Sequence, residues 1–239
     1  MVTARDGVRL ATDIYKPEGD GPWPVLIERT PYGKQLPSRS EITLDAPDES
    51  LSREAFAQRF VEAGYAVVFQ DKRGRYGSEG RYRKYLGDAE DGYDTCAWLV
   101  EQPWCNGKIG TFGLSYCAHT QAALASLNAP GLAAMWLDSG GFANAFHSGI
   151  RQGGAFELKQ ATWAYKQARL SPETAADPVL AAALATEDIR AWFTRMPWRP
   201  GHSPLRHHPD YENSLFEQWG AVSDGPFWRQ AGICAEAFW

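Results

Sequence analysis

The sequence predicts an α/β fold built on a mostly parallel sheet with helices on both faces. Two observations carry this prediction. Segments typical of strands alternate with segments typical of helices through about the first 140 residues, and residues 65–70 form a continuous apolar, β-branched run. Strands of this kind are buried on both faces, and their alternation with helices favours parallel connections.

The strands of the predicted sheet begin near the N-terminus. Residues 8–15 alternate in polarity like a half-buried strand, and residues 24–29 form a short apolar run. Further strands are predicted at 65–70, 107–112 and 132–137.

Helices are predicted between these strands, at 52–63, 88–101 and 116–127. Ser52 is a favourable N-cap for the first of them, and Gly64 is a typical residue just past a helix end. The alternation of these helices with the strands supports a sheet that is covered on both sides.

The pattern changes after about residue 142. Residues 153–169 and 176–195 are predicted to be helical, and no buried-strand run follows them. We interpret this part as a helical cap over the carboxyl edge of the sheet, where open α/β sheets place their pockets. The predicted domains are an α/β core at 1–141, a cap at 142–232 and the start of a return to the core at 233–239. Six of the ten tryptophans follow residue 150: Trp163, Trp192, Trp198, Trp219, Trp228 and Trp239.

Composition excludes several classes of function. The formal net charge is -5, without basic runs, so nucleic acid and anionic membranes are not expected partners. No apolar stretch approaches the roughly 20 residues that span a bilayer, and the N-terminus lacks an apolar signal core, so a cytoplasmic location is predicted.

No cofactor or metal is predicted. The four cysteines show no metal-ligand spacing, and we expect them to be reduced and mostly buried. An acidic cluster (Asp88, Glu90 and Asp91) opens the predicted helix at 88–101. We interpret it as compensation of the helix dipole instead of a metal site.

The chemistry-bearing motif is Gly113-Leu-Ser115-Tyr-Cys117, between a predicted strand and a predicted helix. A serine on such a turn is lifted clear of the sheet, and small residues two positions before and after it let the backbones approach. Gly113 supplies the first small residue, and Cys117 stands where glycine is usual. The amide of Tyr116 lies at the helix N-terminus, which favours an oxyanion. The motif predicts a nucleophilic Ser115 in an α/β-hydrolase fold.

The chain resembles the cocaine esterase-like (CocE/NonD) hydrolases, kin to X-Pro dipeptidyl peptidases and α-amino-acid ester hydrolases. Matching blocks are spread over residues 5–165: RDGVRLATDIYKP at 5–17, RTPYGK at 29–34, GYAVVFQDKRGRYGSEG at 64–80, DGYDTCAWLVEQPWCNGKIGTFGLSY at 91–116 and RQGGAFELKQATWAY at 151–165.

The resemblance implies a serine hydrolase that cleaves a small carboxylic ester, or an amide, through an acyl-serine intermediate. By this resemblance Ser115 is the nucleophile, and the oxyanion is held by the phenol of Tyr32 and the backbone N–H of Tyr116. The block at 71–74 (Asp-Lys-Arg-Gly) also matches, and we interpret it as a structural brace for the loop near the nucleophile.

The histidine and the orienting acid of a triad are not evident. The resemblance places both beyond Trp239, so the chain is interpreted as a C-terminally truncated piece that is inactive alone and leaves a sheet edge exposed. One alternative is an internal triad of Asp138 with His202, His207 or His208. The other is a catalytically inactive binding module. Substrate identity and oligomeric state are left open.

Overall fold

A computed structural model describes residues 1–37, 49–141 and 143–234. The chain divides into two compact units. The first, called here the sheet unit, comprises Met1–Gly80, Tyr85–Ala143 and the described residues from Ala231. The second, called the helical unit, comprises Arg81–Lys84 and Asn144–Gln230. The predicted return to the core at 233–239 lies largely outside the described residues.

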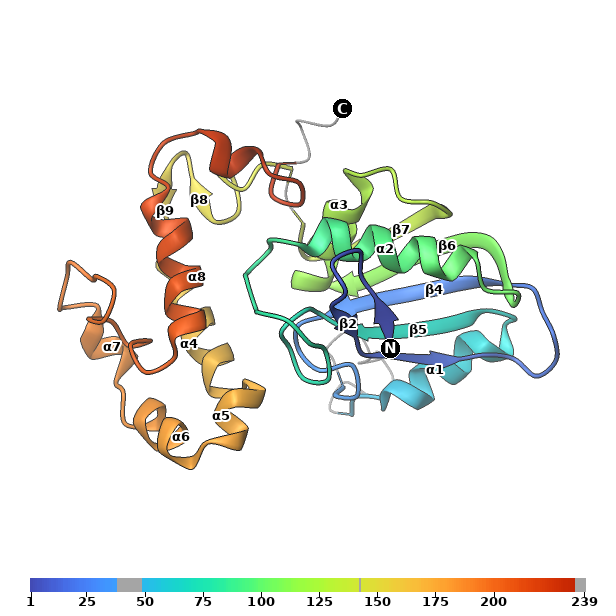
Figure 1. The fold of residues 1–239 in the computed structure, drawn as a ribbon, viewed down its shortest axis with the longest axis horizontal. Helices are drawn as coiled ribbons and strands as arrows, with labels where there is room; N and C mark the ends of the chain where they lie inside the picture. Colours follow the sequence, from blue (N-terminus) through green and yellow to red (C-terminus); the bar gives the residue numbers. More distant parts are fainter. Residues whose placement is uncertain (38–48, 142, 235–239) are drawn as a thin grey trace. The chain divides into compact units, whose positions relative to one another are not determined.

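The sheet unit contains the predicted mostly parallel sheet (Figure 1). Its strand order is β3-β5-β4-β6-β7; only β3 runs antiparallel to its neighbour, and the other pairs are parallel. The predicted strands after residue 24 are confirmed, with ends shifted by a few residues. The strands are β3 (Thr12–Tyr15), β4 (Trp23–Thr30), β5 (Ala66–Asp71), β6 (Cys105–Leu114) and β7 (Leu132–Asp138).

The single strand predicted at 8–15 is wrong, because it is interrupted at Ala11. Its first part, β2 (Arg9–Leu10), pairs with β1 (Val2–Thr3), and the second part is β3. The amide of Ala11 donates to Ser78 Oγ at 2.8 Å, and its carbonyl accepts from the Asp71 amide at 3.0 Å. These bonds, to the last residue of β5 and to Ser78 beyond it, end the pairing of β2 and precede the pairing of β3.

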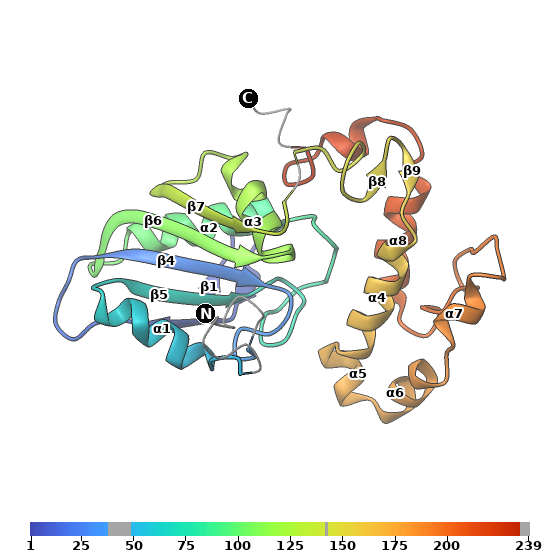
Figure 2. The same cartoon turned by 180° about the vertical axis from the view of Figure 1, so that it is seen from behind.

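The predicted helices between the strands are confirmed as α1 (Arg53–Glu62), α2 (Asp88–Val100) and α3 (Tyr116–Ala125). Ser52 caps α1 as expected, since its Oγ accepts from the Ala55 amide at 3.1 Å. Helix α1 covers one face of the sheet, whereas α2 and α3 lie side by side on the other (Figures 1 and 2).

Each face of the sheet has its own apolar core. The rings of Phe56 and Phe60 on α1 pack against Phe69 of β5 and Phe112 of β6. The opposite face buries aliphatic side chains under α2 and α3: Val25, Ile27, Val68, Leu99, Ile109 and Leu124. Burial on both faces explains why β5 is a nearly continuous apolar run.

The four cysteines are free and buried, as expected. For Cys96, burial raises the pKa of the thiol from 9.0 to about 12. The folded state therefore disfavours the thiolate, so the stability that Cys96 contributes is present below pH 9.0 and is lost as the pH rises toward 12.

We expect this group to lower the free energy of unfolding by ~1.4 kcal/mol between about pH 7 and pH 10. Urea unfolding at the two pH values, under reducing conditions, measures the loss. Cys96→Ala should be less stable at neutral pH but should lose correspondingly less on going to pH 10. Equal losses in both proteins would show that Cys96 does not carry the effect.

The helical unit departs from the sequence prediction in its elements. The helix predicted at 153–169 is wrong in its first part: Gly153 and Gly154, at φ 53° and 90°, form the turn of a small hairpin before α4. The helix predicted at 176–195 is wrong as a single element, because the capping residues Asp177 and Asp188 divide it into shorter helices.

Another helix lies beyond the last one that the sequence predicts. Pro209 is the first residue of α8 (Pro209–Gly220), a position at which proline has no amide to lose. The other elements of this unit are β8 (Arg151–Gln152), β9 (Ala155–Phe156), α4 (Lys159–Arg169), α5 (Pro172–Ala176), α6 (Pro178–Ala185), α7 (Ile189–Trp192) and the 3₁₀ helix η2 (Pro226–Arg229).

Aromatic side chains form much of the helical unit's core. Trp192, Trp198, Tyr165 and Tyr211 are buried together between α4, α7 and α8. The Trp198 indole donates to the Trp192 carbonyl at 2.9 Å, so its polar group is satisfied inside the core. These tryptophans are therefore packing residues.

Strand β7 lies at one edge of the sheet and, within the part that the structure describes, pairs only with β6. The side chains of Met135, Trp136 and Leu137 are exposed, Trp136 by 74%. The sequence-based expectation of an exposed sheet edge is confirmed here. Among the described helices, none has the length and apolarity needed to cross a membrane.

Candidate active site

Ser115 lies between β6 and α3, on the turn that the sequence motif predicts. Its backbone has φ 61° and ψ −113°, a conformation that residues other than glycine rarely adopt. The Ser115 amide donates to the Asp138 carbonyl at 2.9 Å, which ties the turn to the end of β7. Ser115 itself is exposed. A strained, exposed serine that is held by its neighbours points to a functional role.

Two glycines make room for this turn. A Cβ on Gly113 would lie 2.5 Å from the Cβ of Cys117, and Gly113 also has φ 142°. On Gly140, which follows β7, a Cβ would lie 2.3 Å from the Ser115 carbonyl oxygen. The backbones therefore approach as closely as a nucleophile turn requires.

Cys117 is buried beneath the turn, so the thiol fits where glycine is usual. Burial, followed by the nearby Glu28 carboxylate, raises the pKa of the Cys117 thiol well above 9.0. Glu28 is in turn paired with Arg53 at 2.5 Å, and both side chains are buried. A thiol held neutral in this way is a packing group and a poor nucleophile.

Tyr32 is half-buried in the loop after β4, and its amide donates to Thr30 Oγ1 at 3.0 Å. Strands β4 and β6 are parallel neighbours, so the Tyr32 loop and Ser115 follow strand ends at the same edge of the sheet. Asp71 holds this loop: its Oδ1 accepts from the Lys34 amide at 2.7 Å and its Oδ2 from the Gly77 amide at 3.1 Å. Burial raises the pKa of Asp71 against these bonds.

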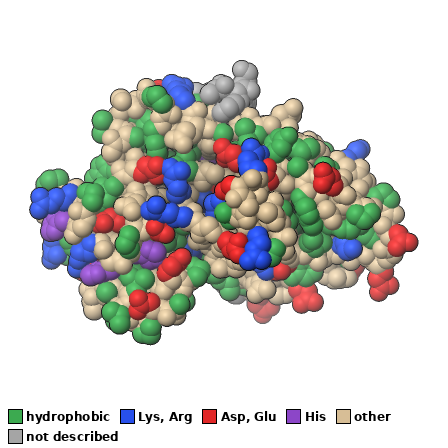
Figure 3. Space-filling model, in the orientation of Figure 1, with side chains coloured by type: hydrophobic (Ala, Val, Ile, Leu, Met, Phe, Trp, Pro, Cys, Tyr) green, Lys and Arg blue, Asp and Glu red, His purple; other side chains and the backbone are tan. Residues whose placement is uncertain are grey.

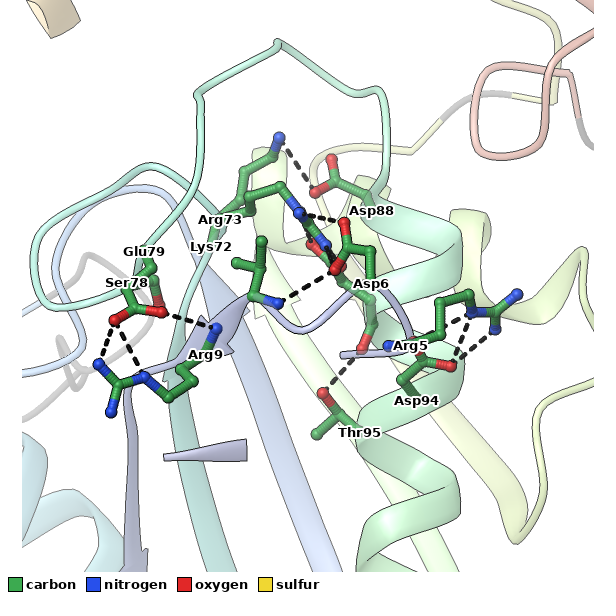
Figure 4. Close-up of polar contacts among 12 residues, drawn as sticks. Arg5, Asp6, Arg9, Lys72, Arg73, Ser78, Glu79, Asp88, Asp94 and Thr95 are labelled. Atoms are coloured by element: carbon green, nitrogen blue, oxygen red, sulfur yellow. Dashed lines mark hydrogen bonds and ion pairs between the residues drawn. The ribbon is translucent and has the colours of Figure 1, made fainter. Parts of the chain in front are cut away.

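The rest of the 71–74 block is also structural, which confirms the interpretation from sequence. The Lys72 ammonium is paired with Asp88 Oδ1 at 3.2 Å, and the Arg73 guanidinium with Asp6 at 2.7 Å (Figure 4). The Arg73 guanidinium also pairs with Asp91 at 2.6 Å. These side chains brace the segment that directly follows β5 against α2.

Asp88 is the residue whose part at this site the sequence analysis missed. Its Oδ2 accepts a hydrogen bond from the Tyr116 phenol at 2.9 Å, so it contacts the residue next to Ser115. The acidic first turn was explained by the helix dipole alone. The contact joins positions 28 residues apart, and no local pattern indicates it.

The candidate histidines have partners within the helical unit. His208 is buried and shares a 2.9 Å hydrogen bond with Ser171, and His207 lies 3.5 Å from Glu187. His202 packs edge-on against Trp192. Basic and histidine side chains gather over the end of this unit where Figure 1 places α7 (Figure 3).

Asp138, the candidate internal acid, contributes its backbone carbonyl to Ser115. No group of histidine, cysteine and carboxylate side chains in the described ranges could hold a metal ion.

The family described as X-Pro dipeptidyl-peptidase (S15 family) matches residues 6–237. The chain belongs to this S15 family. The cocaine esterase of Rhodococcus sp. (strain MB1 Bresler) is 44% identical over 135 residues, which are 56% of this chain and 22% of that protein. The S15 chain thus spans about a fifth of the length of the curated relatives it matches.

Solved structures agree with the S15 assignment. A CocE/NonD family hydrolase from Staphylococcus aureus superposes with a TM-score of 0.55 at 32% identity, over 70% of this chain and 31% of that one. An α-amino-acid ester hydrolase superposes with a TM-score of 0.52 at 27% identity, over 93% of this chain and 40% of that one. The S15 chain therefore has an α/β-hydrolase fold, and its family and relatives are hydrolases.

Proposed function

We propose that this chain carries the nucleophile and oxyanion site of a serine hydrolase that cleaves carboxylic esters. The observation that supports this most directly is the backbone of Ser115, at φ 61° between β6 and α3. Strain of this kind persists only where surrounding structure holds it, and it is typical of serine nucleophiles on α/β-hydrolase sheets.

In the proposed reaction, Ser115 Oγ attacks the substrate carbonyl carbon while a histidine takes its proton. The developing oxyanion accepts hydrogen bonds from the Tyr32 phenol and the Tyr116 amide. The alcohol leaves with the proton, and water then attacks the acyl-Ser115 ester by the same steps. Each oxyanion donor would supply roughly 3 kcal/mol of transition-state stabilisation. A neutral phenol does this without becoming charged itself.

The general base and its orienting acid are proposed to lie in polypeptide outside these 239 residues. Two findings support this. The matched relatives are several times longer than the region they share with this chain, and the candidate histidines His207 and His208 are already engaged by Glu187 and Ser171. The chain alone is then expected to be inactive toward esters.

We further propose that the helical unit is the cap, so that the core comprises residues 1–141 and the cap residues 142–232.

The proposed substrate is a small ester, and the proposed location of the protein is the cytoplasm. An ester is favoured over a peptide because Glu157, a candidate carboxylate for capturing a free amino group, is already engaged. Glu157 is paired with Lys159 at 2.5 Å and accepts from Gln152 at 2.9 Å.

A fluorophosphonate tests the nucleophile directly, since a serine oxygen attacks its phosphorus and fluoride leaves. The full-length protein is expected to hydrolyse 4-nitrophenyl acetate and to lose this activity as the label accumulates. Peptide mapping by mass spectrometry should locate the label on Ser115. Turnover that continues with Ser115 fully labelled, or a label on another residue, would contradict the proposal. The absence of both turnover and label would favour an inactive binding module.

A further inference from the structure

A buried polar chain, Lys72–Asp88–Tyr116, lies directly behind the nucleophile turn. The side chains are 1%, 0% and 3% exposed. The Lys72 ammonium pairs with Asp88 Oδ1 at 3.2 Å, and Asp88 Oδ2 accepts from the Tyr116 phenol at 2.9 Å. The phenol oxygen also accepts from the Tyr85 amide at 2.6 Å. The Tyr116 side chain is thus held by a donor and an acceptor.

Stability alone is a weak reason for such a chain. Removing an ammonium and a carboxylate from water is expensive, and well-packed apolar side chains of similar size often stabilise a protein as well or better. Burial lowers the pKa of Lys72, with Asp88 and Asp91 opposing this shift, so burial disfavours the charged form at this site. A buried polar chain is better explained where it fixes a geometry.

The geometry it fixes is the first turn of α3. Tyr116 is the first residue of that helix and directly follows Ser115. The amides at a helix start have no acceptor within the helix, so their direction depends on how the helix end is held. Anchoring the Tyr116 ring at Asp88 therefore orients the Tyr116 N–H that is proposed to bind the oxyanion.

The same segment also holds the other proposed donor. The Lys72 amide donates to the Thr30 carbonyl at 2.8 Å, at the end of β4, two residues before Tyr32. The adjacent Asp71 carboxylate binds the Lys34 amide just after Tyr32. Residues 71–72 therefore contact the Tyr32 loop through one set of bonds and Tyr116 through the Lys72–Asp88 pair.

We propose that Lys72 and Asp88 are positioning residues that set the Tyr32 loop and the Tyr116 amide at a fixed spacing around the oxyanion. This rests on the proposed function of Ser115. Neither residue touches the substrate; both act through Tyr116. Loss of the pair is expected to affect the chemical step more than substrate binding, because the oxyanion forms only in the transition state.

The test compares Asp88→Asn with Asp91→Asn in the full-length protein. Both carboxylates are buried in the first turn of α2, and each pairs with a cation of the 71–74 block, but Asp91 pairs with Arg73 and has no contact with Tyr116 among the described bonds. We expect Asp88→Asn to lower kcat by about 10- to 100-fold with KM nearly unchanged. Asp91→Asn should keep kcat within about twofold at the same temperature, whatever it does to the melting temperature.

Tyr116→Phe provides a second variant that removes only the hydroxyl, and it should lower kcat like Asp88→Asn. The inference is overturned if Asp88→Asn and Tyr116→Phe retain the wild-type kcat, or if Asp91→Asn lowers kcat equally. If Asp88→Asn does not fold, Tyr116→Phe against Asp91→Asn decides. Turnover in the wild type that does not depend on Ser115 would instead refute the proposed function.

Discussion

Replacing Ser115 by alanine is expected to lower kcat for 4-nitrophenyl acetate in the full-length protein by about 10⁴-fold or more. The hydroxyl is the only group in the proposed mechanism that bonds to the acyl carbon, and losses of this size follow removal of a catalytic serine. Steady-state kinetics with the ester in excess measures the loss. The free energy of unfolding should change little, because Ser115 is exposed and alanine meets the same backbone strain.

The matched control is Ser126→Ala, eleven residues further along the chain and just past the end of α3. The Ser126 hydroxyl donates to the Ala123 carbonyl at 2.6 Å, so its loss perturbs only that helix end. Ser126→Ala should retain the wild-type rate. A Ser115→Ala protein that kept more than about a tenth of the wild-type rate would exclude the acyl-serine mechanism, because residual contamination cannot account for so much.

Local patterns were sufficient to predict the sheet unit from the strand at 24–29 onward, but not the interruption of the strand predicted at 8–15. The strand at 65–70 and the Ser52-capped helix at 52–63 are each indicated by the residue types of one short run of the sequence. The Ser115 turn belongs to the same class, since its strand, glycine and helix are contiguous. Parallel order follows once strands and helices alternate.

The helical unit was harder to predict, because its proline and glycine residues are compatible with more than one local structure. Pro209 reads equally well as part of a loop and as the first residue of a helix, and tertiary packing of Tyr211 and Leu215 decides for the helix. The adjacent pair Gly153-Gly154 was included in a predicted helix but forms a hairpin turn. For Pro209 the deciding contacts come from distant residues, whereas the hairpin forms between residues that directly flank the glycine pair.

Polar contacts across the fold were the least accessible to sequence reasoning. The negative charge of Asp88 is favourable at any helix N-terminus, so its presence in the first turn of α2 is explained without Lys72 or Tyr116. The contact is made only when β5, α2 and α3 are assembled. The resemblance supplied Tyr32 and Ser115 by matching, and it included the 71–74 block that we interpreted as a brace, but it did not indicate the part of Asp88.

Gly140→Ala is expected to disrupt the candidate active site from a position with no chemistry of its own. Its Cβ would lie 2.3 Å from the Ser115 carbonyl oxygen and 2.9 Å from the Ser115 Cα, and both are backbone atoms on a turn already at φ 61°. The backbone at Gly140 and the backbone at Ser115 cannot relieve this clash without one of them moving. We therefore expect a loss of about 3 kcal/mol in the free energy of unfolding. Displacement of Ser115 by even 1 Å would lower kcat by about 100-fold.

Gly220→Ala is the matched comparison, because a Cβ there meets nothing within 4 Å. Neither glycine has the positive φ that would by itself penalise alanine, so the two substitutions differ in the space available and not in backbone strain. Gly220→Ala should leave both stability and kcat near the wild-type values. If Gly140→Ala also left stability and kcat unchanged, the close approach of Gly140 to the Ser115 backbone would not exist in solution. The Ser115 turn would then need another explanation for its strained backbone.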